Sequence, residues 1–259
     1  MGIALVTGGS SGIGAEFARQ LAARGHDLIL VARDQARLDA VAAELRATGR
    51  EVETMAADLS KSRDTDRVAK RLADPRKPID ILINNAGYGL KTKLVEPDIA
   101  EHDDAYAVMV RAVWVLGAAA AKGMKARGHG VIVNVSSIAS QLSMGGYSAM
   151  KAWVQTYSES LANELNGSGV TVTALMPGWV RTEFHQRASI RGSSIPDALW
   201  LDSEYLVREC LRDVDRGKVV SMPSIRYRPL SWLLRHLPRS TVRTISRRIS
   251  LSRSKAASE

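Results

Sequence analysis

Residues 3–14 read IALVTGGSSGIG, and this stretch decides the fold. Its first five residues are apolar or β-branched without polar alternation, which is typical of a strand covered on both faces. Gly8, Gly12 and Gly14 follow, and then a helical pattern begins. Such glycines let the backbone turn tightly and approach a pyrophosphate, which meets unpaired N–H groups at the start of the helix. The stretch predicts nucleotide binding; a merely tight glycine turn is the alternative.

Short Val/Ile-rich runs and longer helical patterns alternate through the rest of the chain. Strands are expected at residues 3–7, 27–32, 51–56, 79–83, 130–136, 170–175 and 218–222. Helices are expected at 12–24, 34–48, 60–73, 98–126, 147–166 and 203–215. This alternation implies right-handed crossovers and an α/β fold, a doubly wound parallel sheet of about seven strands with helices on both faces. We expect one domain over residues 1–222 and an extension over 223–259.

Four polar residues stand where predicted helices begin. Asp34, Ser60, Asp98 and Asp202 are each expected to be the N-cap of the helix that follows, because short polar side chains accept bonds from its free N–H groups.

The composition limits the class of protein. The chain has 259 residues, 45% hydrophobic and 24% charged, which is ordinary globular usage. A single cysteine, Cys210, excludes an intrachain disulfide and a cysteine zinc cluster. The start of the chain lacks the pattern of a secretory signal, and the longest nearly apolar stretch, 112–121, is too short to span a membrane. We expect a cytoplasmic chain in a reducing compartment, without a bound metal.

The net charge of +9 is unevenly placed along the chain. Residues 216–259 carry eleven Lys/Arg and one acid, Glu259, whereas residues 1–215 are almost neutral. Attraction to any polyanion must therefore arise in this tail.

Five marks in order along the chain point to a known family. They are the turn from Gly8 to Gly14 with Thr7 before it, Asp58, Asn84-Asn85-Ala86-Gly87, Tyr147 with Lys151, and Pro177-Gly178 with Thr182. The glycine spacing differs from the common dinucleotide fingerprint, and the set resembles the short-chain dehydrogenase/reductase family over residues 3–222. The resemblance implies a Rossmann-type domain and hydride transfer between a nicotinamide cofactor and a carbonyl/alcohol pair.

The resemblance implies Ser137, Tyr147 and Lys151 as catalytic residues. Tyr147 and Lys151 are four apart on a predicted helix, so their side chains share a face. A nearby ammonium is expected to lower the pKa of the tyrosine from its ordinary value of about 10. In the family, the tyrosine protonates the carbonyl oxygen, the serine hydrogen-bonds that oxygen, and the lysine also holds the nicotinamide ribose. Ser143 is a weaker alternative to Ser137.

The residue after the second strand bears on the choice of cofactor. Arg33 follows Gly14 by nineteen residues, where an arginine accommodates the 2′-phosphate of NADP and an acid would bind the ribose of NAD. The alternative is that the next residue, Asp34, is that acid. We prefer Asp34 as an N-cap, and hence NADP(H); Ser10 or Ser11 is expected to add a hydroxyl contact. The expected cofactor-binding positions are Gly8, Ser10, Ser11, Gly12, Ile13, Gly14, Arg33, Asp58, Leu59, Asn84, Ala86, Gly87, Tyr147, Lys151, Pro177, Gly178, Val180 and Thr182.

Two departures from the family pattern concern the site. Ser137 precedes Tyr147 by ten residues rather than the family's usual thirteen or so, which implies a shortened loop. Met109 stands where the family commonly has an asparagine, which opens the helix so that a main-chain carbonyl can hold a water beside the lysine. Three interpretations remain: the relay is rebuilt locally, the enzyme is slow, or the site binds cofactor without turnover.

Two segments outside the motifs carry further predictions. Residues 179–201 form a candidate lid of apolar side chains with glycine and proline. In the tail, arginines alternate with Trp, Leu and Ile, and Pro229 and Pro238 divide it into two expected short helices. These helices pack on the body or a partner subunit, or lie on a membrane surface. We expect no nucleic-acid partner, since stacking aromatics are sparse.

The sequence thus predicts an NADPH-dependent oxidoreductase of an apolar, keto-acyl or lipid-like carbonyl, with Tyr147 as general acid/base. A homo-oligomer is expected from the family resemblance. The alternatives are a cofactor-binding regulator without turnover, which Met109 favours, and a membrane or partner adaptor, which the tail favours. The inner face of the membrane is then one expected location.

Overall fold

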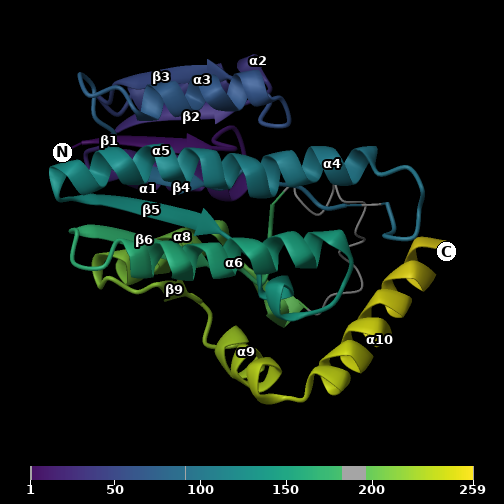
Figure 1. Cartoon of the computed structure of the whole chain (residues 1–259). Coiled ribbons are helices and arrows are strands. Elements are labelled where there is room, and N and C mark those ends of the chain that lie inside the picture. The colour runs from purple at the N-terminus through teal and green to yellow at the C-terminus, as the bar shows by residue number, and fades with distance from the viewer. Residues whose placement is uncertain (1, 91, 183–196, 259) are drawn as a thin grey trace.

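The computed structural model describes residues 2–90, 92–182 and 197–258, with side chains as far as residue 250 apart from that of Ala198. Within these residues, seven strands form one parallel sheet in the order β3-β2-β1-β4-β5-β6-β9 (Figure 1). The strands are β1 (Ile3–Thr7), β2 (Asp27–Ala32), β3 (Val52–Ala56), β4 (Ile81–Asn84), β5 (Gly130–Val135), β6 (Val170–Leu175) and β9 (Val220–Ser221). The expected α/β sheet is confirmed, and its strands match their expected ranges within two residues at each end.

The strand order predicts a ligand-binding crevice between β1 and β4, at the carboxyl ends of the strands. β1 pairs with β2 on one side and with β4 on the other. The chain therefore leaves the carboxyl end of β1 toward one side of the sheet and the carboxyl end of β4 toward the other side. Ligands of open parallel sheets bind at such a reversal. The glycine turn after β1 and the segment after β4 both lie there.

Helices cover both faces of the sheet. They are α1 (Gly12–Ala23), α2 (Gln35–Arg46), α3 (Ser62–Leu72), α4 (Ala100–Tyr106), α5 (Ala112–Arg127), α6 (Gly146–Glu164), α8 (Ser203–Asp215), α9 (Tyr227–His236) and α10 (Arg239–Ser258). Because side chains alternate along a strand, Ala4 and Val6 of β1 share one core cluster with α1, α2 and α8. Leu5, between them, belongs to a second cluster with α3, α5 and α6.

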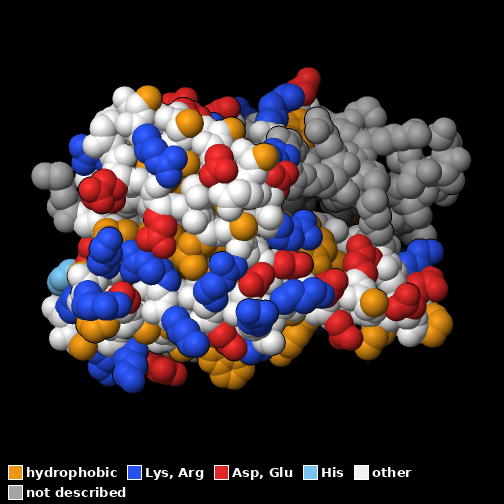
Figure 2. All heavy atoms as spheres, turned by 90° about the horizontal axis from the view of Figure 1, so that it is seen from above, with side chains coloured by type: hydrophobic (Ala, Val, Ile, Leu, Met, Phe, Trp, Pro, Cys, Tyr) orange, Lys and Arg blue, Asp and Glu red, His pale blue; other side chains and the backbone are white. Residues whose placement is uncertain are grey.

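The surface on the side of α2 and α3 carries both signs of charge. In Figure 2 Lys/Arg and Asp/Glu side chains are intermingled on this face. Ion pairs join Arg71 to Glu53 at 3.1 Å and Arg67 to Asp64 at 3.2 Å. This face therefore offers no surface of a single sign.

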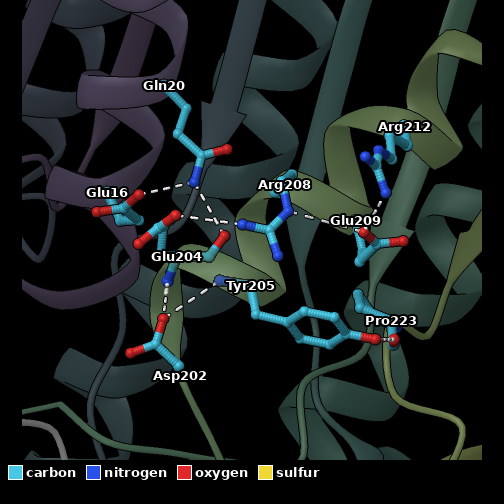
Figure 3. A network of polar contacts seen from close by, with 9 residues as sticks. All are labelled: Glu16, Gln20, Asp202, Glu204, Tyr205, Arg208, Glu209, Arg212 and Pro223. Atoms are coloured by element: carbon cyan, nitrogen blue, oxygen red, sulfur yellow. Dashed lines mark hydrogen bonds and ion pairs between the residues drawn. The ribbon is translucent and has the colours of Figure 1, made fainter.

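A polar network holds α8 against α1, the helix that follows the glycine turn (Figure 3). Asp202 caps α8, since its Oδ1 accepts hydrogen bonds from the backbone N–H groups of Glu204 at 2.8 Å and Tyr205 at 3.3 Å. From α1, Gln20 donates to the carbonyl oxygen of Glu204 at 2.9 Å and to the carboxylate of Glu16 at 2.7 Å. The capped end of α8 is thereby fixed to α1.

Two of the four expected N-caps are confirmed. Asp34 accepts a bond from the N–H of Arg37, and Asp202 caps α8. Ser60 is wrong, because α3 begins at Ser62 with Lys61 as its N-cap, and the side chain of Ser60 bonds Asp58 instead. Asp98 is off by one position, since Ile99 precedes α4, although the Asp98 carboxylate accepts from the first N–H of that helix.

One continuous helical run, Ala100–Arg127, includes α4, the π-helical turn η1 (Ala107–Arg111) and α5. By length and composition alone it could cross a membrane, in contrast to what the short apolar stretch 112–121 suggested. More than half of its most apolar window, 56%, is buried inside the protein. A core helix packed on a sheet passes the same test, so the run is weak support for a membrane span.

The tail forms two helices, α9 and α10, which extend from the sheet edge toward the carboxyl ends of the strands (Figure 1). Pro238 separates them as predicted, but Pro229 does not divide the tail. It lies in the first turn of α9, where a missing N–H is tolerated. Tyr227, Leu234 and Val242 are buried, so one side of the tail packs on the body of the protein.

Candidate active site

The glycine turn joins β1 to α1 at the crevice. The Gly8 N–H donates to the carbonyl of Val31 at 2.7 Å, and Gly8 and Gly12 have φ values of +65° and +53°, which favour glycine. A Cβ on Gly14 would collide with the carbonyl oxygen of Gly8. A Cβ on Gly12 would lie 3.3 Å from the side chain of Thr182, so this expected cofactor-binding residue faces the turn. Backbone conformation at Gly8 and Gly12 and close packing at Gly14 thus require glycine in this turn.

The end of β1 is tied to the segment after β4. The Thr7 hydroxyl accepts bonds from the N–H groups of Asn85 at 2.9 Å and Ala86 at 3.1 Å, and the Asn85 amide donates to the carbonyl of Thr7 at 3.0 Å. Asn85 was not among the expected site residues. Its amide would also contact a Cβ on Gly8 or Gly14, so it packs under the turn.

Asn84, by contrast, turns its side chain into the sheet. Its amide donates to Asn134 at 2.9 Å, and Asn134 donates to Ser158 at 3.0 Å. Asn84 is 4% exposed. Since its amide is engaged there, Ala86 and Gly87 are the parts of this motif that border the crevice.

At the far end of the crevice Arg33 follows β2. Asp34 serves as the N-cap of α2, which was the preferred interpretation. Arg33 is exposed and forms no ion pair within the described part of the chain. Its charge reaches Asp58 and Tyr88, which places all three near one another. Partial burial raises the pKa of Asp58, but hydrogen bonds from Ser60 and the charge of Arg33 outweigh burial, so the pKa lies below its ordinary value. The carboxylate is therefore ionised at neutral pH.

The three expected catalytic residues come together at the carboxyl end of β5. Ser137 follows the strand, and Tyr147 and Lys151 lie on the first turns of α6. The hydroxyls of Ser137 and Tyr147 are hydrogen-bonded, and Nζ of Lys151 lies 5.8 Å from the centre of the Tyr147 ring. Ser143 is exposed, and its N–H donates to Ser246 of the tail.

Burial decides the ionisation of the pair. It raises the pKa of Tyr147 to about 12, and the hydrogen bond from Ser137 opposes this only in part. The expected lowering of the tyrosine pKa by the ammonium is therefore wrong for this arrangement. Burial lowers the pKa of Lys151 to about 8, and its Nζ donates to the carbonyl of Val135 at 2.8 Å. The phenol of Tyr147 is therefore protonated at neutral pH.

Met109 lies beside the lysine within η1. A Cβ on Gly87 would lie 3.2 Å from Sδ of Met109 and 3.5 Å from Nζ of Lys151, so these three residues converge. The helix is opened into a π turn at this point, with the N–H of Ala112 bonded to the carbonyl of Ala107. The opening that the family obtains with an asparagine is present here with a methionine, and π turns often mark functional sites.

The remaining predicted positions lie on the glycine turn or on segments that follow strands of the sheet. Leu59 is buried after β3, Ile13 packs on the core at the start of α1, and Ser10 and Ser11 are part of the glycine turn. Val180 is buried in β7 (Trp179–Val180), which pairs with β8 (Trp200–Leu201) in a small sheet that the sequence did not predict. Residues 183–196 of the candidate lid lie outside the described residues.

The Pro177-Gly178 motif is covered by the tail. A Cβ on Gly178 would collide with the ring of Tyr227, the first residue of α9. The Tyr227 hydroxyl donates to the carbonyl of Leu199 at 2.6 Å and accepts from the N–H of Trp179 at 3.1 Å. The tail therefore supports the loop after β6 from beneath, a role that the sequence did not predict.

The chain is similar to proteins of known family. A family model described as short chain dehydrogenase matches residues 2–191. Gluconate 5-dehydrogenase of Gluconobacter oxydans is 36% identical over 71% of this chain and 73% of that protein. The 3-oxoacyl-[acyl-carrier-protein] reductase of Synechocystis is 34% identical over 70% of this chain and 75% of that protein.

A solved structure is similar over nearly its whole length. The short-chain dehydrogenase from Sphingobium yanoikuyae in complex with NADPH is 36% identical, covers 92% of this chain and 97% of its own, and superposes with a TM-score of 0.82. With the seven-stranded parallel sheet and the group of Ser137, Tyr147 and Lys151, these similarities identify the chain as an oxidoreductase of the short-chain dehydrogenase family.

Proposed function

We propose that the protein is an NADPH-dependent reductase of apolar carbonyl compounds. The observation that carries this proposal is the hydrogen-bonded pair of Ser137 and Tyr147, with Lys151 one helical turn away, at the edge of the crevice that holds the glycine turn.

The residues present fit a bound dinucleotide. The glycine turn packs closely against Asn85 and Ala86, and α1 begins at Gly12 with no side-chain cap hydrogen bond from Ser11, so backbone N–H groups at the helix start are available to a pyrophosphate. Gly87 and Lys151 border the other end of the crevice, beside the predicted place of the nicotinamide ribose. When bound, the dinucleotide supplies a hydride.

The ribose end of the crevice favours a 2′-phosphate. Arg33 is exposed at the end of β2, and Asp34 is engaged with the backbone of α2 rather than free to accept from a ribose hydroxyl. A guanidinium and a phosphate form strong charge-assisted hydrogen bonds. This arrangement supports NADPH over NADH, as does the NADPH in the similar Sphingobium enzyme.

Proton transfer is the task of Tyr147. With a pKa of about 12 its phenol is protonated at neutral pH, and it gives that proton to the carbonyl oxygen of the substrate as the carbonyl carbon takes up hydride. Ser137 donates to the same oxygen and holds it in line with the phenol. The resulting phenolate lies beside Lys151, whose positive charge stabilises it before a proton returns from solvent.

An apolar substrate is supported by the segment between β4 and α4. Leu94, Val95 and Ile99 are 67%, 85% and 55% exposed, and they lie on the connection that leaves the carboxyl edge of the sheet. Of the two similar enzymes, the acyl-carrier-protein reductase suits this surface better than the gluconate enzyme. A keto-acyl chain would cover these side chains.

The test is NADPH oxidation with three carbonyl compounds: a medium-chain 3-oxoacyl thioester, an aryl ketone and 5-ketogluconate. We expect the first two to be reduced and the third to be reduced least. Tyr147→Phe should lower kcat by roughly 10²–10⁴-fold, the usual contribution of a general acid. Tyr157→Phe, on the same helix, is the matched control and should retain activity.

Met109 supports one rival function, a cofactor-binding regulator without turnover. Under that function the protein would bind NADPH tightly, oxidise it with none of the three compounds, and be unaffected by Tyr147→Phe. That set of results would replace the reductase proposal.

We further propose that two copies associate through α5 and α6. Trp114 of α5 is 57% exposed and lies 6.0 Å from the ring of Trp153 on α6, which stacks on Tyr157 at 4.9 Å. Such an exposed aromatic group is typical of an interface. Light scattering after size-exclusion chromatography should show at least a dimer, and Trp114→Ser should lower its stability on dilution.

A further inference from the structure

Apolar side chains are exposed along one segment of the tail. Ile225 is 74% exposed, Leu230 43%, Trp232 63% and Leu233 45%. They stand on or just before α9, whose opposite side buries Tyr227 and Leu234. Nothing in the described residues covers this outer side, and water-exposed Trp and Leu on one short helix need a reason.

Positive charge surrounds these apolar side chains. Residues 216–250 carry nine Lys/Arg and no Asp/Glu. The exposed ones along α9 and α10 are Arg226, Arg228, Arg235, Arg239, Arg243, Arg247 and Arg248. The face in Figure 2, where both signs mix, is different in kind. The outer side of α9 and its flanks thus combines exposed apolar side chains with charges of one sign, which is positive.

A hollow of about 370 Å³ opens beside Trp232, between α9 and the edge strand β9. Lys218, Arg228, Arg235 and His236 line it, with Asp213 as the acid. Asp213 is engaged by Lys218 at 2.5 Å and by Ser221 at 2.9 Å. Arg235 forms no ion pair among the described residues, so its guanidinium is available to bind a phosphate group in this hollow.

We propose that α9 and its flanks form a docking surface for an anionic lipid bilayer, which we call the tail surface: Ile225, Arg228, Leu230, Trp232, Leu233, Arg235, Arg239 and Arg243. Trp and Leu enter the interfacial layer and the arginines pair with lipid phosphates, as in helices that lie on membranes. A second copy of the chain is disfavoured, because its tail would bring like charges together. A nucleic acid would leave the apolar side chains without a role.

The helices that carry the tail surface contact the segment beside the site through their buried sides. Gln141 of η2 (Ile138–Gln141) donates to Ser231 of α9 at 2.7 Å, and the N–H of Ser143 donates to Ser246 of α10 at 2.9 Å. η2 is the segment between Ser137 and Tyr147. If the reductase proposal holds, docking would bring the substrate side of the protein to a source of acyl-chain carbonyls.

The experiment is co-sedimentation of the full chain with vesicles of phosphatidylglycerol and phosphatidylcholine (3:7), and with vesicles of phosphatidylcholine alone. We expect binding to the first and little to the second. Arg235→Gln/Arg243→Gln should weaken binding about 30-fold, since each basic residue at an anionic surface contributes about 1 kcal/mol, or roughly fivefold. Trp232→Ser/Leu233→Ser should weaken it as well. NADPH affinity serves as the check that each variant is folded.

Matched controls keep the proposal open to refutation. Arg63→Gln/Lys70→Gln removes the same charge from exposed positions on α3 and should bind vesicles as the unaltered chain does. Equal loss in this control, equal binding to both vesicles, or no binding at all would overturn the proposal. The proposal would also be overturned if the unaltered chain did not bind vesicles and Trp232→Ser/Leu233→Ser lowered the subunit number. That result would assign the surface to a second copy of the chain. Tyr147→Phe should bind vesicles normally, so a failed reductase and a failed docking surface are distinguishable.

Discussion

The ring of Tyr227 occupies the space over Gly178 that the Cβ of any other residue would need. Gly178 belongs to the motif at the end of β6, and Tyr227 begins α9, so the tail is built into the support of the site. The ring is 3% exposed, with its hydroxyl held at both sides by backbone groups, and it has little room to move aside.

Gly178→Ala should therefore destabilise the protein by about 1–3 kcal/mol, the usual effect of forcing extra volume into a packed region. NADPH affinity should fall with it, because the loop that carries Trp179 and Thr182 must shift. Urea unfolding and NADPH titration measure the two effects. Gly123→Ala is the control: the added Cβ would approach only the flexible end of Arg127, and stability should hold or rise. Wild-type stability in Gly178→Ala would contradict this contact.

The fold could be predicted from the sequence because its signals are local. The buried strands are short apolar runs, and each helix follows from its own periodicity and caps. Where the prediction failed, the cause was a contact or a strand pairing that the local sequence pattern does not show. Ser60 has the chemistry of a cap, but its side chain bonds Asp58, and the helix begins at Ser62. The short β7–β8 pair forms between segments whose connection has no strand pattern.

The site residues were predicted where a motif fixed their spacing. They were missed where the contact joins residues that are far apart in the sequence. The spacing of Tyr147 and Lys151 puts them on one face, but it says nothing about burial, which determines their pKa values. Tyr227 is 49 residues from Gly178 along the chain, and no pattern connects them. The π turn at Met109 interrupts a helical pattern that reads as continuous.

Arg33→Ala should weaken NADPH binding by roughly 10–150-fold, because hydrogen bonds to a charged group contribute about 1.5–3 kcal/mol. NADH binding should change little, since NADH lacks the 2′-phosphate. Fluorescence titration with both nucleotides measures the ratio. Arg63→Ala on α3 removes an equal charge away from the crevice and should leave the ratio as it is. A uniform loss for both nucleotides would argue against a phosphate contact at Arg33.

Lys151→Met should change how stability depends on pH. Burial lowers the pKa of Lys151 to about 8, against 10.5 for the unperturbed group, so between these values the unfolded chain binds more protons. The contribution of Lys151 to the free energy of unfolding therefore rises from pH 8 to pH 10.5, whereas below pH 8 the buried ammonium destabilises the folded state by a constant amount. Lys151→Met removes this rise, so its stability relative to the unaltered chain should fall steadily across that range.

Urea unfolding at half-unit steps from pH 7 to pH 10 measures this difference. Lys122→Met, at an exposed position of α5, is the control and should run parallel to the unaltered chain. Parallel curves for Lys151→Met as well would mean that Lys151 is not held with a lowered pKa. Below pH 8 the difference in stability between Lys151→Met and the unaltered chain should stay constant, because the lysine is protonated in both the folded and the unfolded state.

Met109→Asn tests whether the opened helix already supplies what the family's asparagine provides. The π turn exists with methionine, so the backbone is in place, and the substitution should raise kcat by no more than a few fold. It should also destabilise the protein by about 1–3 kcal/mol, since Met109 is fully buried and an amide there lacks an assured partner.

Met109→Leu retains the apolar side chain and should leave kcat unchanged. Steady-state rates with NADPH and urea unfolding measure both effects. A rise in kcat of a hundredfold or more in Met109→Asn would show instead that the methionine, and not the shape of the helix, limits the reaction.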